Sequence, residues 1–236
     1  VRAITKAMTD AERIAGIEVG TVYCGAGGEQ IAQRISHGVA SVTGSEVRTS
    51  DLARVNDVAS TVSFGHDQEL LHAIPHDYLV DGQPGYADPI GMAGERVEAE
   101  VYILTARSSA LAHQRKAIEK AGWHVGEVVV EPLAASLAVL TPEEREMGAV
   151  LVDLGGGSTS VAIFQGGKLR HTASLRFAGG HLTSDLVHGL RVTQAEAERL
   201  KERWGAAYEP LISENEVVEV STTAGHGPQP VQRRLI

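Results

Sequence analysis

The segment Leu151-Val-Asp-Leu-Gly-Gly-Gly-Ser-Thr-Ser160, continued by Val161-Ala-Ile-Phe164, predicts a strand, a tight turn and a second strand. Three consecutive glycines, Gly155, Gly156 and Gly157, let a ligand approach the backbone closely. Successive N–H groups in such a turn can bind an anion, and Ser158 and Thr159 add hydroxyl donors. Asp153 ends the first strand, where it can hold a hydrated Mg²⁺ ion. The segment is therefore either a phosphate-and-magnesium hairpin or a plain glycine-rich hairpin without a ligand.

Two common nucleotide-binding patterns are absent around these glycines. A Walker A loop requires G-x-x-x-x-G-K-[ST], which the segment does not contain. The dinucleotide-binding pattern requires a helix directly after the glycines, whereas apolar β-type residues follow here.

The bulk composition is that of a soluble globular protein. The chain has 236 residues, enough for one large or two modest domains, and 43% of them are hydrophobic. Its formal net charge of −9 argues against a nucleic-acid-binding surface over the whole molecule. The single cysteine, Cys24, excludes an internal disulfide and is expected to be packed rather than catalytic.

The glycine segment resembles the second phosphate loop of the actin-like ATPase superfamily, and the chain as a whole resembles the FtsA family of bacterial cell division. Four further stretches carry the closer resemblance: His72-Ala-Ile-Pro-His-Asp-Tyr-Leu-Val-Asp81, Asp88-Pro-Ile-Gly-Met-Ala-Gly-Glu-Arg-Val-Glu98, Pro132-Leu-Ala-Ala-Ser-Leu-Ala-Val-Leu-Thr141 and Leu169-Arg-His-Thr172. The resemblance implies an α/β fold with actin-like (ribonuclease H-like) lobes and an inserted α+β subdomain that is specific to the family. The resemblance implies that this subdomain makes filament contacts, whereas the sequence alone favours an ordinary solvated surface.

The implied domain boundaries follow from this fold. Residues 1–25 would belong to the first lobe, 26–105 to the inserted subdomain, 106–147 to the return into the first lobe and its connecting helix, 148–190 to the phosphate-binding core of the second lobe, and 191–236 to its outer subdomain. By the same resemblance, the chain is expected to be an internal fragment, truncated at both ends. It would lack the first phosphate loop and the C-terminal membrane helix of the family.

The resemblance also assigns ligand-binding residues. Glu131, before Pro132, would position water or magnesium-bound water, although an acid in a first helical turn is also favoured by the helix dipole alone. Gly179 and Gly180 precede a helix, whose unpaired N–H groups would lie near the nucleotide, or they form a plain strand-to-helix turn. Glu198 and Lys201 are three residues apart on a helix and would contact ribose and base, or simply form a salt bridge.

The pattern of apolar residues predicts most of the secondary structure. Helices are expected at residues 4–17, 52–62 (capped by Ser50 or Asp51), 108–121, 133–140, 178–189 and 193–204; strands at 21–24, 30–35, 70–81 (interrupted at Pro75), 95–105 (half-buried), 125–130, 168–177, 216–220 and 231–236; and loops at 83–94 and 224–230. The nearly uncharged helix at 133–140 is expected to be packed on most sides.

The function implied by the resemblance is an ATP- and Mg²⁺-binding cytoplasmic protein, peripheral at the inner face of the cell membrane at the division site. It would form filaments and bind the C-terminal tail of FtsZ, with Arg233 and Arg234 as candidates because that tail is partly acidic. Ser160 stands where the family usually has Asp, so any ATPase activity would be slow. The alternatives are a sugar-kinase-like phosphotransferase and a nucleotide-free scaffold. The ten histidines show no metal-binding spacing, and no zinc site is expected.

Overall fold

The computed structural model describes residues 1–223 and 227–236, so the predicted loop at 224–230 lies partly outside the described residues. The chain divides into two compact units. The first unit contains residues 1–153 and 160–174, and the second contains 154–159 and 175–236. The resemblance implied that the second lobe begins at residue 148. The two compact units are divided differently, because residues 160–174 cluster with the first unit.

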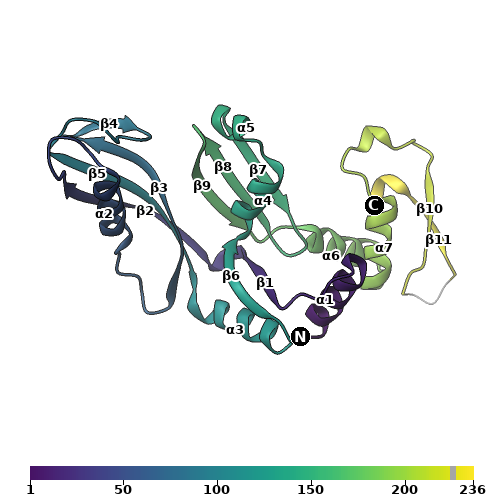
Figure 1. The fold of residues 1–236 in the computed structure, drawn as a ribbon. Helices are drawn as coiled ribbons and strands as arrows, with labels where there is room; N and C mark the ends of the chain where they lie inside the picture. Colours follow the sequence, from purple (N-terminus) through teal and green to yellow (C-terminus); the bar gives the residue numbers. More distant parts are fainter. Residues whose placement is uncertain (224–226) are drawn as a thin grey trace. The chain divides into compact units, whose positions relative to one another are not determined.

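A four-stranded antiparallel sheet with strand order β2-β5-β3-β4 forms one part of the first unit (Figure 1). Its strands are β2 (Ile31–Ser41), β5 (Arg96–Arg107), β3 (Gln68–Val80) and β4 (Gln83–Tyr86), and helix α2 (Thr49–Ser60) packs on one face. Val55 and Ala59 of α2 are fully buried against Val97, Val101 and Ile103 of β5. Strand β4 falls within the segment predicted to be a loop, so that prediction was wrong there.

Strand β5 is more deeply buried than its alternating sequence predicted. Val97, Ala99 and Val101 face α2 as expected, but Tyr102 and Leu104 on the opposite side are also buried. They pack in a second core with Val130 and with apolar residues of two other strands. A central strand that is covered on both faces loses the alternation of burial that a half-exposed strand has.

Strand β3 continues through Pro75 instead of breaking there. Its pairing with β5 shifts register between Pro75 and Asp77, as in a β-bulge, and again between Leu70 and His72. A bulge accommodates proline because the ladder is locally disrupted at that point. The predicted interruption is therefore a change of register within one continuous strand.

The rest of the first unit is built around a parallel strand pair. Strands β1 (Thr21–Ala26) and β6 (His124–Val130) pair directly, and helices α1 (Arg2–Ala15), α3 (Ser108–Glu119), α4 (Glu131–Val139) and α5 (Pro142–Met147) accompany them. Cys24 is buried in their core with Leu111 and Ile118, as predicted. Helix α4 is not packed on most sides: only Pro132 and Ser136 are buried, so that expectation was wrong.

The glycine segment lies in a three-stranded meander. Strands β7 (Ala149–Leu154), β8 (Thr159–Gln165) and β9 (Lys168–Leu175) are adjacent in that order. Ala162, Phe164 and Leu169 of this sheet pack against Tyr102 and Leu104 in the core that they share. The predicted strand-turn-strand arrangement is therefore present.

The second unit consists mainly of two helices and a small hairpin. Helices α6 (Gly179–Leu190) and α7 (Gln194–Trp204) pack with strands β10 (Val217–Val220) and β11 (Gln229–Gln232) around Leu186, Leu200 and Val220. Short 3₁₀ turns occur at Gly28–Gln30 in the first unit and at Glu209–Leu211 and Arg233–Leu235 in the second. The strand predicted at 231–236 thus ends early. Across the described residues, no helix combines the length and apolar character needed to span a membrane.

Candidate nucleotide-binding site

The turn at residues 155–158, here called the glycine turn, is closed by one backbone hydrogen bond. The Gly155 N–H donates to the Ser158 carbonyl at 3.1 Å. Within the described part of the chain, no hydrogen bond is found to the N–H groups of Gly156, Gly157 and Ser158. Three successive unpaired N–H groups are the donor set that an anion needs.

The glycines of the turn have different roles. A Cβ atom at Gly156 or Gly157 would meet no atom within 4 Å, so internal packing does not require glycine there. A Cβ at Gly155 would lie 2.9 Å from the Ser158 carbonyl oxygen, so the tight turn requires glycine at that position. The open surface over Gly156 and Gly157 leaves room for a ligand to reach the backbone.

The start of α6 holds the glycine turn and is not itself open to an anion. The N–H groups of Gly179 and Gly180 donate to the carbonyls of Gly155 and Gly156 at 3.0 and 2.8 Å. The N–H of His181 donates to the Ala178 carbonyl at 2.9 Å. The expectation of unpaired N–H groups at this helix start was therefore wrong: the glycine turn already occupies them.

The two hydroxyl residues of the segment differ in availability. Thr159 is buried, and its hydroxyl donates to the Phe177 carbonyl, so the side chain fixes the strand and is not free for phosphate. Ser158 is half-buried, and no hydrogen bond to its hydroxyl is found among the described residues. The Ser158 hydroxyl is therefore available as the predicted donor to phosphate, whereas the Thr159 hydroxyl is not.

Glu198 and Lys201 form a polar group with the start of α6. Lys201 Nζ donates to Glu198 Oε1 at 2.7 Å, to Thr183 Oγ1 at 2.9 Å and to the Gly179 carbonyl at 3.3 Å. The Thr183 hydroxyl donates to Glu198 Oε2 at 2.6 Å. The hydrogen bonds from Lys201 and then Thr183 hold the pKa of the Glu198 carboxyl below its usual range. The fully buried Thr183 links α7 to α6, a role that its sequence position did not reveal.

A groove in the second unit lies beside Lys201. It has a volume of about 620 Å³ and is lined by α6, the end of α7 and the chain after it, including Leu186, Leu190 and Ala206. Asp185 and Lys201 are the charged side chains on its wall. A mainly apolar cleft with a few polar groups is the usual character of a small-molecule site.

Glu131 and Asp153 are two acidic residues of the first unit whose negative charges repel one another. Although part of the Glu131 side chain reaches solvent, desolvation raises the pKa of its carboxyl, and the negative charge of Asp153 raises it further. Two carboxylates that repel each other in this way would be relieved by a cation between them. The donor set of Glu131 and Asp153 therefore fits Mg²⁺, which takes one or two carboxylates and keeps several waters.

Two glycines that were not among the predicted site residues make room for Glu131. A Cβ at Gly25 would lie 2.8 Å from Glu131 Cγ, and a Cβ at Gly27 would lie 2.0 Å from Glu131 Oε2. Gly25 lies near the end of strand β1 and Gly27 directly follows it, so the Glu131 side chain rests on bare backbone there. The signal in the sequence was Cys24-Gly-Ala-Gly-Gly28, a glycine cluster directly after an apolar strand.

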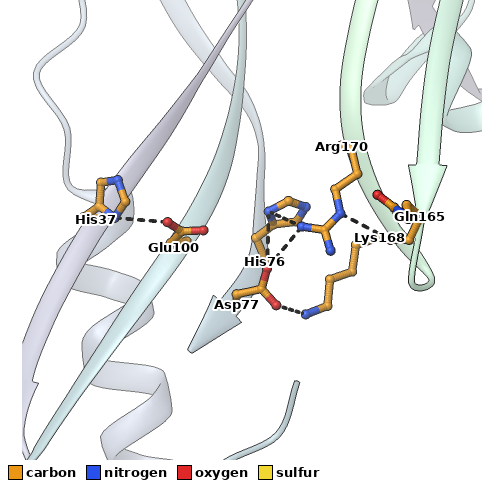
Figure 2. Close-up of polar contacts among 7 residues, drawn as sticks. All are labelled: His37, His76, Asp77, Glu100, Gln165, Lys168 and Arg170. Atoms are coloured by element: carbon orange, nitrogen blue, oxygen red, sulfur yellow. Dashed lines mark hydrogen bonds and ion pairs between the residues drawn. The ribbon is translucent and has the colours of Figure 1, made fainter. Parts of the chain in front are cut away.

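A second cluster of metal-ligand types lies on the β2-β5-β3-β4 sheet. His76, Asp77 and Glu100 offer ligand atoms within 4.8 Å of one another. Asp77 is already paired with Lys168 Nζ at 2.5 Å and with Arg170 Nη1 at 3.1 Å (Figure 2). With two cations on this carboxylate, the cluster is charge-balanced without a metal ion, and we assign none to it.

Comparisons with known proteins point to one family. A family model described as "Cell division protein FtsA" matches residues 150–236, and one described as "SHS2 domain inserted in FTSA" matches residues 28–105. The FtsA proteins of Pseudomonas aeruginosa and Bacillus subtilis are 35% and 36% identical over 236 and 223 residues, covering 100% and 94% of this chain.

The chain spans about half the length of these curated relatives, 57% and 51% respectively. Among solved structures, a chain of the PilM-PilN type IV pilus biogenesis complex matches with a TM-score of 0.60 at 18% identity. That match covers 86% of this chain and 56% of the other, and it supports the fold alone.

Proposed function

Because the chain belongs to the FtsA family of cell-division proteins, we propose that it binds ATP with Mg²⁺ and acts in bacterial division as an actin-like filament protein. Its fold is that of the actin-like ATPases, with the SHS2 domain inserted at residues 28–105. The observation that carries the nucleotide proposal is the row of three N–H groups at Gly156, Gly157 and Ser158, for which the described residues supply no hydrogen-bond acceptor.

Each candidate residue has a distinct proposed role. The glycine turn would bind phosphate oxygens through its N–H groups, with the Ser158 hydroxyl as an added donor. Glu131 and Asp153 would hold Mg²⁺ through its waters. Gly179 and Gly180 would act indirectly by fixing the turn. Glu198 and Lys201 would contact the ribose and base only by exchanging part of their mutual ion pair for ligand contacts.

Turnover of the bound nucleotide is expected to be slow. Ser160 is buried and offers no carboxylate at the position where one would help to organise the metal. The remaining acids are Glu131 and Asp153, and the raised pKa of Glu131 suits a group that takes up a proton from water. We therefore propose an ATP-dependent assembly switch with at most weak ATPase activity.

The proposed cellular role is to connect FtsZ to the cytoplasmic membrane. The second unit would bind the C-terminal tail of FtsZ, and the inserted domain would make contacts along a filament. These partners are proposed from family membership, and they place the protein at the inner face of the membrane at the division site.

Titration calorimetry with Mg-ATP on the full-length protein tests the nucleotide proposal. The wild type should bind, and Asp153→Ala and Gly156→Val should abolish binding while leaving the fold intact. Gly20→Val is the matched control, because a Cβ at Gly20 also meets no atom within 4 Å. A folded wild type that binds no nucleotide would refute the proposal and favour a nucleotide-free scaffold.

A further inference from the structure

Strand β9 is attached to the β2-β5-β3-β4 sheet by an ion-pair cluster centred on Asp77 (Figure 2). Each Asp77 oxygen accepts from a different cation, Oδ1 from Lys168 at 2.5 Å and Oδ2 from Arg170 at 3.1 Å. The cluster joins two of the stretches that carry the resemblance to the FtsA family, His72-Ala-Ile-Pro-His-Asp-Tyr-Leu-Val-Asp81 and Leu169-Arg-His-Thr172. These stretches are far apart in sequence and meet at this point.

The bulge in β3 builds the acidic side of the cluster. Asp77 is the register partner of Glu100, and the pairing shifts immediately before it. The bulge brings His76 and Asp77 together opposite Glu100, so that their ligand atoms gather within 4.8 Å. Pro75, which cannot donate a ladder hydrogen bond, fits the disrupted position.

The charges of the cluster balance. Asp77 and Glu100 contribute two carboxylates, and Lys168 and Arg170 contribute two cations. His76 is only 4% exposed, and its Nδ1 lies 3.5 Å from Arg170 Nη1. Desolvation, and next the charge of Arg170, lower the pKa of His76. Removing the Asp77 charge would leave two partly buried cations beside a buried ring.

A second, buried contact holds the same strand. The Gln33 side-chain oxygen accepts from the Thr172 N–H at 2.9 Å, from the Thr172 hydroxyl at 2.8 Å and from the Tyr102 hydroxyl. Thr172 and Tyr102 are 7% and 3% exposed. Strand β9 is the edge of its own sheet, and here a backbone N–H of that strand is satisfied by the neighbouring sheet.

We propose that Asp77 is a positioning residue that links the inserted domain to the nucleotide-binding turn. Asp77 fixes β9, which pairs with β8, and β8 begins at Thr159 directly after the glycine turn. Nucleotide bound at the turn and the conformation of the inserted domain are then coupled through one strand pair, and each affects the other. This inference rests on the proposed nucleotide site.

Hydrogen exchange and Mg-ATP titration on the full-length protein test the link. In the wild type, Mg-ATP should slow exchange in residues 154–165 and also in residues 68–80. In Asp77→Asn, protection of 68–80 should disappear while that of 154–165 remains, and affinity for Mg-ATP should fall about tenfold. Without nucleotide, this variant should already exchange faster over residues 159–175.

Two further variants keep the result specific. Arg170→Gln should reproduce the effect of Asp77→Asn, and the double variant should be no weaker than either single variant, because both remove the same interaction. Arg96→Gln removes an exposed ion pair with Glu98 on the same sheet and should change nothing.

Three results would overturn the link: unchanged affinity and retained protection of 68–80 in Asp77→Asn, additive effects in the double variant, or an equal loss in Arg96→Gln. Failure of the wild type to bind Mg-ATP would instead refute the proposed function. In that event, exchange without nucleotide still decides whether Asp77 holds β9.

Discussion

Two glycines in helix α6 have opposite requirements at the scale of single residues. A Cβ at Gly180 would lie 2.8 Å from the Gly156 carbonyl oxygen, whereas one at Gly189 would meet nothing within 4 Å. Gly180→Ala should therefore lower the free energy of unfolding by about 1–3 kcal/mol, although alanine normally favours helix. Gly189→Ala, the matched control, should raise it by up to about 1 kcal/mol. Urea unfolding measures both, and a stabilised Gly180→Ala would contradict the proposed contact.

Glu131 gives a pH-dependent prediction at the same scale. Its carboxyl has a pKa raised by desolvation and by Asp153, so the folded protein holds a proton that the unfolded chain releases. Stability should therefore fall as the pH rises through the usual glutamate range toward the raised value. Glu131→Gln removes this penalty, so its midpoint of thermal unfolding should exceed that of the wild type at pH 7 but not at pH 4.

Magnesium provides the control for Glu131. Mg²⁺ held by Glu131 and Asp153 should remove the repulsion and raise the midpoint of the wild type at pH 7, with no such gain in Glu131→Gln. An equal response to Mg²⁺ in both proteins would exclude Glu131 from the proposed Mg²⁺ site.

The sequence was a better guide to the types of residue in the candidate site than to their hydrogen-bond partners and tertiary contacts. Asp153, Gly156 and Ser158 could be picked out because glycine turns after strands expose N–H groups. The pairing of the Gly179 and Gly180 N–H groups could not be foreseen, because their acceptors lie more than twenty residues away in the chain. The space that Gly25 and Gly27 leave for Glu131 is likewise set by tertiary contact.

At the scale of elements, Asp51 holds the start of α2 in an unexpected way. The N-terminal cap is Arg48, and the buried Asp51 carboxylate, in the first turn, accepts from the N–H groups of Arg48 and Thr43 at 2.9 and 3.2 Å and from Arg54 at 2.6 Å. Capping by Ser50 or Asp51 was therefore wrong, because the helix begins at Thr49.

Substitution of Asp51 should loosen α2 and its sheet. The N–H of Arg48 is the main cause that lowers the pKa of Asp51, so its stabilising effect is complete above the usual aspartate range and is lost as the pH falls below it. Asp51→Asn should lower the midpoint of thermal unfolding by several degrees at pH 7, and this loss should shrink as the pH falls below the usual aspartate range. Asp57→Asn, an exposed acid on the same helix, is the control, and an equal loss there would contradict the assignment.

Element type followed from sequence periodicity where one face of an element meets solvent. The alternation in the first half of β5 and the helical spacing in α2 gave the right elements. The second half of β5 is covered by the core it shares with Phe164 and Leu169, which no local pattern encodes. For helix α4 the sequence predicted too much burial, since Leu137 and Val139 are 65% and 62% exposed despite an apolar sequence.

At the scale of the whole molecule, the resemblance supplied what periodicity could not. The inserted domain was placed at residues 26–105 by resemblance, and the SHS2 model matches 28–105. Local patterns alone would not have joined β2 to β5 and β3, because these strands are separated by α2 and long loops. The grouping of residues 160–174 with the first unit depends on side chains such as Asp77 and Gln33, whose partners only the folded chain reveals.

Substitutions of the two arginines Arg233 and Arg234 test partner binding and stability separately. Arg233 donates to Glu216 at 2.8 Å and to the Trp204 carbonyl at 2.9 Å, so it holds the second unit together and is poorly available to a partner. Arg234 is exposed, and its side chain donates a hydrogen bond to Gln232 Oε1 at 2.8 Å. Arg234→Ala should weaken binding of an acidic FtsZ tail peptide about threefold, with the effect shrinking at high salt, and leave thermal unfolding unchanged. Arg233→Ala should lower the unfolding midpoint instead. Fluorescence anisotropy with the labelled peptide measures the first effect, and unaltered binding by Arg234→Ala would exclude Arg234 from the proposed FtsZ contact.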